Sequence, residues 1–445
     1  MRLRGVVHLQ KLIDHVHTLS PYKWYGQVRH AAGLTIESAG PRAFIGELCY
    51  IWASPDQKGT KVRAEVVGFK DDRILLMPLD DTRRIAPGSY VEGTGKPLNV
   101  ACGPSLIGQI VNGVGEPFLQ SAALGDTDAN YSTDNSPPNP LERPRISEIM
   151  SVGVRAIDGL LTMGKGQRVG IFAGSGVGKS TLMSMIAKQS DADVNVIALI
   201  GERGREVKEF VERDLGEEGL KKSVVVVATS DQPALLRVKG AQTATAIAEY
   251  FRDKGKNVNL MMDSVTRFAM AQREIGLAIG EPPTTKGYPP SVFAMMPKLL
   301  ERSGTNQSGS ITGLYTVLVD GDDMNEPIAD AVRGILDGHF VLDRQLANRG
   351  QYPAVNVLKS VSRLMKDLVE NDHLHAAKLF RQRLADYEQS EDLISLGAYK
   401  QGSSKDIDAA IHDHPAMLDF LKQEVEKSDS FAETKTKLIQ LFKQE

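Results

Sequence analysis

Nine consecutive residues, Ala173-Gly174-Ser175-Gly176-Val177-Gly178-Lys179-Ser180-Thr181, follow a predicted strand and open a predicted helix. Glycines in such a turn let backbone N–H groups fold around phosphate oxygens, and the new helix presents its positive end to them. The lysine then reaches the β- and γ-phosphates of a nucleoside triphosphate, and the hydroxyl after it ligates Mg²⁺. Ala173 stands where the usual pattern begins with glycine, but the remaining glycines keep the backbone freedom. The sequence therefore predicts a P-loop that binds ATP and Mg²⁺ through Lys179 and Ser180.

Strand and helix patterns alternate around this P-loop. Apolar, β-rich runs recur, with helical stretches such as residues 241–252 between them. Strands that are apolar on both faces and joined by helices are typical of a mostly parallel α/β sheet. The sequence predicts such a sheet, with strands at residues 168–172, 194–200, 224–228, 258–262, 311–319 and 339–342.

Two carboxylates each follow a predicted strand of this sheet. Asp263 closes one strand, and Glu202 lies just beyond another. Because the carboxyl ends of parallel strands face the same crevice, we expect both side chains beside the P-loop. Asp263 is then the second Mg²⁺ ligand, and Glu202 orients or deprotonates the attacking water. For Glu202 the alternative is an ion pair with Arg203 or Arg205.

Composition divides the chain into four regions of a multidomain α/β protein. Residues 1–23 carry an apolar stripe and predict an amphipathic helix, which packs on its own domain or docks on a partner. Residues 24–95 hold short β-rich runs that predict a small β-barrel. Residues 96–365 form the ATPase domain with the mostly parallel sheet, and a Pro- and Gly-rich linker covers residues 121–146. Residues 366–445 are rich in Lys, Glu, Gln, Leu and Ala, which favours an α-helical domain.

The composition of the chain is that of an ordinary globular protein. Its 445 residues include 53 Lys and Arg against 56 Asp and Glu, a net charge of −3. Nucleic-acid-binding domains usually carry a strongly basic stripe, so we expect no nucleic acid. No run approaches the ~18 apolar residues of a membrane span, and polar residues interrupt the N-terminal region where a secretory signal would lie. With 2 cysteines the chain fits a reducing compartment, and we expect it in the cytoplasm with peripheral membrane contact only.

Several motifs resemble the rotary ATP synthase α/β family. They are Gly-Glu-Arg-Gly-Arg-Glu at 201–206, Asp-Ser-Val-Thr-Arg-Phe at 263–268, and Pro-Ala-Val-Asn-Val-Leu-Lys-Ser-Val-Ser-Arg at 353–363. Within the family, residues 290–304 and 320–327 resemble the branch that powers type III protein export. The resemblance runs from about residue 25 to residue 420. It implies an N-terminal β-barrel, a central RecA-like ATPase domain and a C-terminal helical domain.

The resemblance also assigns roles to single residues. Glu202 matches the family's catalytic carboxylate, which polarises the attacking water. Arg203 matches a γ-phosphate contact or a partner of that carboxylate, and Arg267 takes a supporting role. Tyr352 matches the aromatic residue that stacks on adenine. The alternative is that Tyr352 is a tyrosine buried in the core.

One further residue, Arg363, matches an arginine finger that enters the site of the neighbouring subunit. A cation that arrives in trans neutralises charge in the transition state and is worth about 10³–10⁵ in rate. The resemblance therefore implies a homohexameric ring whose interfaces combine Arg363 of one subunit with the next subunit's Lys179, Ser180, Glu202 and Asp263.

The function that the resemblance implies is Mg²⁺-dependent ATP hydrolysis that assists flagellar type III protein export. The resemblance also implies partners: a stator-like regulatory protein at the N-terminal helix, and a coiled-coil stalk protein in the pore that faces residues 320–326. Further implied partners are a membrane export gate and the chaperones and export substrates that it receives. Residues 397–406 lack the acidic run that meets the shaft in the rotary synthases. This difference argues against a synthase role.

Three alternatives remain open from the sequence. The first is a virulence-type secretion ATPase or a proton-linked synthase subunit. The second is a RecA-type hexameric motor that moves nucleic acid, which the net charge of −3 disfavours. The third is a regulatory ring subunit that binds nucleotide without cleaving it, which the presence of Glu202 disfavours.

Overall fold

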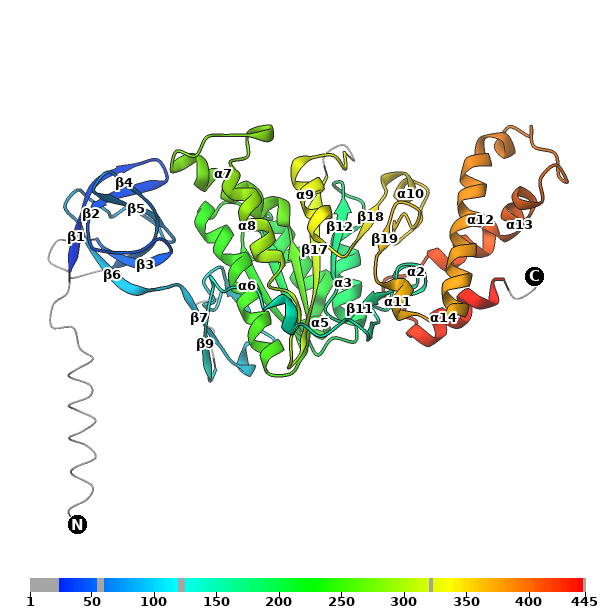
Figure 1. Ribbon diagram of the computed structural model, residues 1–445, viewed down its shortest axis with the longest axis horizontal. Coiled ribbons are helices and arrows are strands. Elements are labelled where there is room, and N and C mark those ends of the chain that lie inside the picture. The colour runs from blue at the N-terminus through cyan, green and yellow to red at the C-terminus, as the bar shows by residue number, and fades with distance from the viewer. Residues whose placement is uncertain (1–23, 54–59, 119–124, 320–322, 443–445) are drawn as a thin grey trace, which may run out of the picture. The chain divides into compact units, whose positions relative to one another are not determined.

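The computed structural model describes residues 24–53, 60–118, 125–319 and 323–442 (Figure 1). The chain divides into two compact units, one ending at Leu98 and the other beginning at Asn99. The predicted amphipathic helix at residues 1–23 lies outside the described residues. None of the described helices combines the length and the apolar character that a bilayer span requires.

The first unit is a closed barrel with the strand order β1-β2-β5-β4-β3-β6. In β3 every second residue is buried, so that Cys49 and Ile51 belong to the barrel core. Gly26 passes so close to Gly40 that a β-carbon would lie 1.8 Å from the Gly40 carbonyl oxygen, so a side chain has no room there. The predicted N-terminal barrel is confirmed. Its strands are β1 (Tyr25–Ala32), β2 (Thr35–Ala39), β3 (Glu47–Trp52), β4 (Lys61–Lys70), β5 (Arg73–Pro78) and β6 (Tyr90–Pro97).

A sheet with the strand order β19-β18-β12-β17-β15-β13-β14-β8 forms the centre of the second unit. Its strand pairs are parallel from β18 to β8, and the short strands β19 and β16 are added in antiparallel fashion. The predicted mostly parallel sheet is confirmed. Its strands are β8 (Ile110–Asn112), β12 (Arg168–Ala173), β13 (Val194–Ile200), β14 (Ser223–Ala228), β15 (Asn257–Asp263), β16 (Gly304–Thr305), β17 (Ser310–Leu318), β18 (Gly338–Leu342) and β19 (Val361–Ser362).

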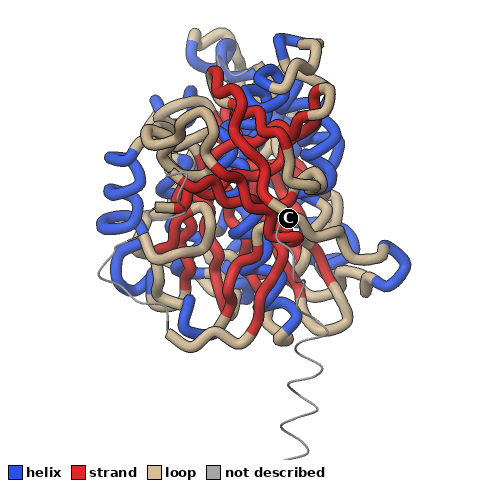
Figure 2. Tube along the Cα trace, turned by 90° about the vertical axis from the view of Figure 1, so that its left-hand side faces the viewer, coloured by secondary structure: helices blue, strands red, loops and turns tan. Residues whose placement is uncertain are grey.

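Helices flank this sheet (Figure 2). Helix α6 packs against β13, β14 and β15, and it is buried along almost its whole length. Helix α7 packs against α6 and β17, and α9 lies against β12 and β17. The helices of this part of the chain are α2 (Arg155–Leu160), α3 (Lys179–Gln189), α4 (Gly204–Glu209), α5 (Gly216–Leu220), α6 (Ala234–Asp253), α7 (Val265–Ala278), α8 (Pro290–Leu300), α9 (Pro327–Ile335), α10 (Arg344–Asn348) and, after the last strand, α11 (Met365–Leu368).

The chain that leads into the sheet is fixed by a buried ion pair. Strand β7 (Asn99–Cys102) pairs with β9 (Ala129–Ser132), so part of the predicted linker is a strand rather than loop. The Arg302 guanidinium lies 2.8 Å from Glu249, with side-chain exposures of 3% and 1%. Arg302 also donates to the Thr133 carbonyl, and the Asn135 amide donates to Glu249. Because buried charges must be paired, this cluster fastens the linker to α6.

The C-terminal region is helical, as predicted from its composition. Helix α12 (Asn371–Ser395) packs against α13 (Lys405–Leu421) and α14 (Phe431–Gln440). Arg155, at the start of α2, donates to the carbonyls of Asp419, Phe420 and Lys422 at the end of α13. Cations at a helix C-terminus satisfy its free carbonyls and its dipole. Arg155 therefore joins the helical region to the body of the second unit.

We expect Arg302→Ala to lower the free energy of unfolding by about 3–5 kcal/mol, because the substitution leaves the Glu249 carboxylate buried and unpaired. Chemical denaturation measures this change. The control is Lys221→Ala, which removes an exposed ion pair with Glu218 and should cost about 0–1 kcal/mol. Equal losses in the two variants would contradict the role given to the buried pair.

Candidate active site

The predicted P-loop lies between β12 and α3, in the strand–loop–helix context that such a loop requires. Gly176 and Gly178 have φ values of +77° and +92°, which non-glycine residues rarely adopt. The Val177 side chain is buried beneath the loop, whereas Ser175 is exposed. Helix α3 begins at Lys179, so its free N–H groups and its positive dipole end face the loop. The backbone is thus shaped to receive an anion.

Lys179 lies between the two predicted carboxylates. Its ammonium Nζ is 2.5 Å from Asp263 Oδ1 and 3.9 Å from Glu202 Oε1. Asp263 is the last residue of β15 and also accepts a hydrogen bond from Thr316 Oγ1 at 2.8 Å. Since β13 and β15 are parallel neighbours, their carboxyl ends bring Glu202 and Asp263 to the same edge of the sheet. The structure therefore brings together the three side chains that the sequence analysis placed here.

Glu202 occupies an environment that disfavours its charged form. Burial, together with repulsion from Asp263, raises the pKa of Glu202 to about 7, although the nearby Lys179 ammonium opposes the shift. Among the described residues, no hydrogen-bond partner reaches Glu202 Oε1. A carboxylate with a pKa near neutrality and a free oxygen is suited to accept a proton from water.

The alternative ion pairs of Glu202 do not form. Arg203 pairs with Glu206 at 3.1 Å, and Arg205 pairs with Glu209 at 3.4 Å. The Arg203 side chain is 78% exposed, so it is free to reorient toward a ligand. Glu202 is therefore held by its place after β13 and not by a neighbouring arginine.

These groups line one cavity of about 490 Å³. Arg267 reaches it from α7, where its side chain packs against Gly201; a β-carbon on that glycine would lie 2.7 Å from Arg267 Cβ. Residues of a π-helical segment, Phe210–Leu215, also line the cavity. The sequence did not predict this segment, because a single π turn leaves no distinct periodicity. The lining residues include Ala173, Gly174, Ser175, Gly176, Gly178, Lys179, Ser180, Thr181, Glu202, Arg203, Glu206, Phe210, Arg213, Asp214, Asp263 and Arg267.

The donor set of this cavity suits a metal ion that arrives with phosphates. Among the described residues there is no cluster of three or more His, Cys, Asp or Glu side chains that could hold a metal by itself. Mg²⁺ is usually bound by one or two protein oxygens together with phosphates and water. The Ser180 hydroxyl and the Asp263 carboxylate, both in the cavity wall, fit that requirement.

Tyr352 lies against the P-loop from outside this cavity. A β-carbon on Gly178 would be 3.7 Å from two atoms of the Tyr352 ring, so the ring lies beside Gly178 with room for little more than a β-carbon between them. Tyr352 is 49% exposed, and the alternative of a buried core tyrosine is therefore wrong. An aromatic face beside a phosphate-binding loop is suited to stack on a nucleotide base.

The structure does not bring Arg363 to the P-loop of its own chain. Arg363 follows β19, and its N–H donates to the Asp337 carbonyl at the start of β18. The P-loop leaves β12 at Ala173, which pairs with Leu342 at the far end of β18. Asp337 and Leu342 are about 16 Å apart along an extended strand. Arg363 therefore lies at the opposite end of the sheet.

Comparison with known protein families agrees with this geometry. Residues 153–362 match the nucleotide-binding domain of the ATP synthase alpha/beta family, and residues 28–95 match the β-barrel domain of that family. Residues 369–440 match the C-terminal domain of the type III secretion ATPase EscN. The chain therefore belongs to the ATP synthase alpha/beta family, and it is a P-loop ATPase.

Within that family the chain belongs to the type III export branch. It is 65% identical over 414 residues to the flagellum-specific ATP synthase of Bacillus subtilis (strain 168), which covers 93% of this chain and 94% of the relative. It is 50% identical over 418 residues to a type 3 secretion system ATPase of Xanthomonas euvesicatoria, with 94% of each chain covered.

Solved structures support the same placement. The assembled ATPase EscN from the type III secretion system of enteropathogenic E. coli superposes with a TM-score of 0.87 at 44% identity, covering 94% of this chain and 99% of that one. EscN has also been solved in complex with its central stalk EscO.

The pKa of Glu202 predicts the pH dependence of turnover. Because the pKa is raised to about 7, the carboxyl becomes protonated as the pH falls through that value and can no longer accept a proton. We expect kcat/KM for MgATP to fall about tenfold per pH unit below pH 7, since this ratio reports the pKa of the free enzyme. Steady-state assays from pH 5.5 to about 8.5 measure the profile.

The matched variant is Glu202→Gln, which should retain ATP binding and lose at least ~100-fold in kcat. Its kcat/KM should no longer fall as the pH drops below 7. Glu217→Gln, at an exposed position of α5, is the control and should leave the profile unchanged. If kcat/KM of Glu202→Gln still falls in the same way below pH 7, the group that titrates there is not Glu202.

Proposed function

We propose that this chain is the ATPase of flagellar type III protein export and that it hydrolyses MgATP as a homohexameric ring. The observation that carries the proposal is the 65% identity to a flagellum-specific ATP synthase over nearly the whole of both chains. The site supports it, because a lysine, two carboxylates and an anion-binding loop meet in one cavity. A type 3 secretion system ATPase is also a relative, at 50% identity.

The roles of the residues follow from the geometry. The backbone N–H groups of residues 174–178 and the Lys179 ammonium bind the β- and γ-phosphates, for which Lys179 exchanges its contact with Asp263. The Ser180 hydroxyl and Asp263 would hold Mg²⁺, which would neutralise negative charge on the phosphates. Lys179 and Thr316 both donate to Asp263 Oδ1, and the release of Lys179 removes the ammonium that would compete with the metal ion for this carboxylate.

Glu202 accepts the proton of the attacking water. Its unpartnered Oε1 and its pKa near 7 make it a base that is half ionised at neutral pH. Arg203 and Arg267 border the same cavity and support the γ-phosphate or the Glu202 carboxylate. Tyr352 stacks on adenine at the Gly178 side of the loop.

A neighbouring subunit completes the site. Arg363 lies at the far end of the sheet from its own P-loop, and its side chain is exposed except for a 3.4 Å contact to the Arg333 carbonyl. A guanidinium placed in this way does not reach the P-loop of its own chain. We propose that it enters that site and neutralises charge on the transferred phosphate.

The remaining partners belong to the same proposal. EscN binds a central stalk, and we propose that a coiled-coil stalk protein meets the acidic loop at residues 320–326 in the pore of the ring. A stator-like regulatory protein would bind residues 1–23, for which the sequence predicts an amphipathic helix, and recruit the ring to the membrane export gate. There ATP turnover would release chaperones and deliver export substrates on the cytoplasmic side.

Arg363→Ala should spare nucleotide binding but lower the ATPase rate of the assembled protein by about 10³-fold or more, since trans-acting fingers contribute that much. Specific activity measured against protein concentration, with mass measured in parallel, should rise with assembly in the parent and stay flat in the variant. Arg83→Ala, at an exposed arginine of the barrel, is the control for charge loss. Unchanged activity in Arg363→Ala would remove the finger from the mechanism.

The export role is tested by complementation. In Bacillus subtilis that lacks its own flagellum-specific ATP synthase, expression of this chain should restore motility and the export of flagellar proteins. Lys179→Ala, accumulated to the same level, should restore neither, because the P-loop then lacks its phosphate ligand. A parent chain that hydrolyses ATP in that strain without restoring export would contradict the flagellar assignment.

A further inference from the structure

We propose that Gln423 is a positioning residue that sets the place of the Tyr352 ring beside the P-loop and thereby tunes the affinity for the nucleotide base. This inference rests on the proposed stacking of Tyr352 on adenine. It assigns a function in nucleotide binding to a residue of the C-terminal helical region. No sequence motif marks Gln423, which lies two residues beyond the end of α13.

The side chain of Gln423 is buried and uses all of its hydrogen-bonding groups. It is 7% exposed. Its Oε1 accepts from the Arg155 N–H at 2.9 Å, and its Nε2 donates to the carbonyls of Gly153 and Lys427, both at 2.7 Å. Residues 153 and 155 lie at the start of α2, so the amide is fixed to the body of the second unit. A side chain held in this way cannot rotate without losing several bonds.

The backbone of Gln423 carries this anchorage to Tyr352. The Gln423 N–H donates to the Tyr352 carbonyl at 2.8 Å. On the other side of the same residue, the Tyr352 ring lies beside Gly178. Gly153 and Arg155 are thus joined through Gln423 to Tyr352, and through Tyr352 to the P-loop.

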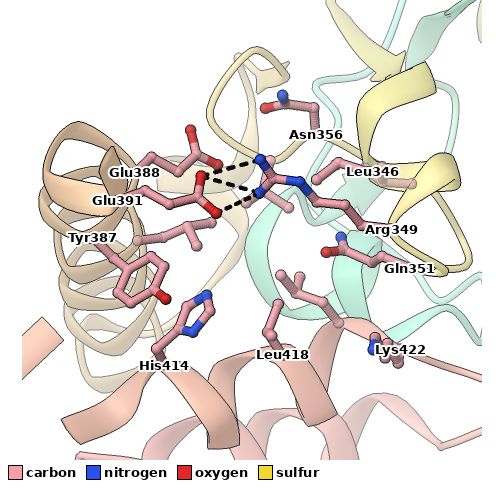
Figure 3. Close-up of a pocket in the computed structure, with 14 residues that line it drawn as sticks. Leu346, Arg349, Gln351, Asn356, Tyr387, Glu388, Glu391, His414, Leu418 and Lys422 are labelled. Carbon is pink, nitrogen blue, oxygen red and sulfur yellow. Dashed lines mark hydrogen bonds and ion pairs between the residues drawn. The ribbon is translucent and has the colours of Figure 1, made fainter. Parts of the chain in front are cut away.

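Core packing and backbone bonds hold the part of this segment that follows Tyr352. Val355 and Val357 belong to the hydrophobic core, the Ala354 carbonyl accepts from the Asp343 N–H, and the Asn356 N–H donates to the Val341 carbonyl. A cavity of about 190 Å³ separates residues 346–357 from α12 and α13, as Figure 3 shows. Leu346, Gln351 and Asn356 line one wall, and Tyr387, His414 and Leu418 line the other. The bidentate ion pair of Arg349 with Glu391 crosses the gap. Because a cavity lies beside the segment, polar contacts of this kind add to the core packing in setting its position.

The Arg349–Glu391 ion pair and the hydrogen bonds of Gln423 differ in how strongly they can fix the position of Tyr352. Arg349 pairs with Glu391 at a 59% exposed surface position, where an ion pair contributes little. Gln423 is buried and bonds directly to the residue whose ring faces the nucleotide. We therefore assign the positioning of Tyr352 to Gln423, which makes base affinity sensitive to how the C-terminal helices sit on the body of the second unit.

The experiment compares variants of the full-length assembled protein. Gln423→Ala should raise KM for MgATP about fivefold or more with little change in kcat, because base–aromatic stacking is partly lost. Inorganic tripolyphosphate, which has no base, should inhibit the parent and the variant equally. Gln423→Glu keeps the size of the side chain but turns a carboxylate oxygen toward two carbonyls, and it should not rescue KM. Gln389→Ala, at an exposed position of α12, is the matched control.

Tyr352→Ala separates this inference from the proposed function. If Tyr352→Ala raises KM and Gln423→Ala does not, the positioning role is overturned and the base contact stands. If Tyr352→Ala leaves KM unchanged, the base contact itself fails, and the inference fails with it. Rescue by Gln423→Glu, or weaker tripolyphosphate inhibition in Gln423→Ala, would assign Gln423 a packing role and would also overturn the proposal.

Discussion

An ammonium group held between two carboxylates organises the second unit of this protein. Lys179 contacts Asp263 at 2.5 Å and lies 3.9 Å from Glu202, at the carboxyl ends of neighbouring parallel strands. Two carboxylates this close in a half-buried site repel each other, and the lysine between them offsets that repulsion. A bound triphosphate competes with both carboxylates for the same lysine. Nucleotide binding must therefore rearrange this charge cluster, which links phosphate recognition to the metal ligand and to the base.

The rest of the second unit maintains the geometry of that cluster. The parallel order of β12, β17, β15 and β13 sets the spacing of the loop and the carboxylates, and α6 buries the sheet behind them. The C-terminal helices share a hydrophobic core with the rest of this unit, and the hydrogen bonds of Arg155 and Gln423 add to that contact. The proposed mechanism then needs Arg363 from another subunit, because the sheet separates this residue from its own P-loop.

Much of this arrangement could be predicted from the sequence, and the exceptions have physical causes. Long apolar strands such as β13 and β15 leave a clear pattern in the sequence. Because these strands are parallel, the carboxylates at their ends must lie at the same edge of the sheet. Three-residue β8 and the π turn at Phe210–Leu215 are too short to produce a period. The linker strand β9 is polar, half-exposed and held by pairing with β7, so local propensity does not reveal it. Gln423 is polar, buried and defined by bonds to residues far along the chain, which no local pattern encodes.

The most direct test is a crystal structure of the assembled protein with Mg²⁺ and a non-hydrolysable ATP analogue. We predict phosphates within the turn at residues 173–181, the Lys179 ammonium moved from Asp263 to the phosphate oxygens, and Arg363 of an adjacent subunit near the γ-phosphate. An analogue bound elsewhere, or a Lys179–Asp263 contact that stays intact beside the bound triphosphate, would contradict the account.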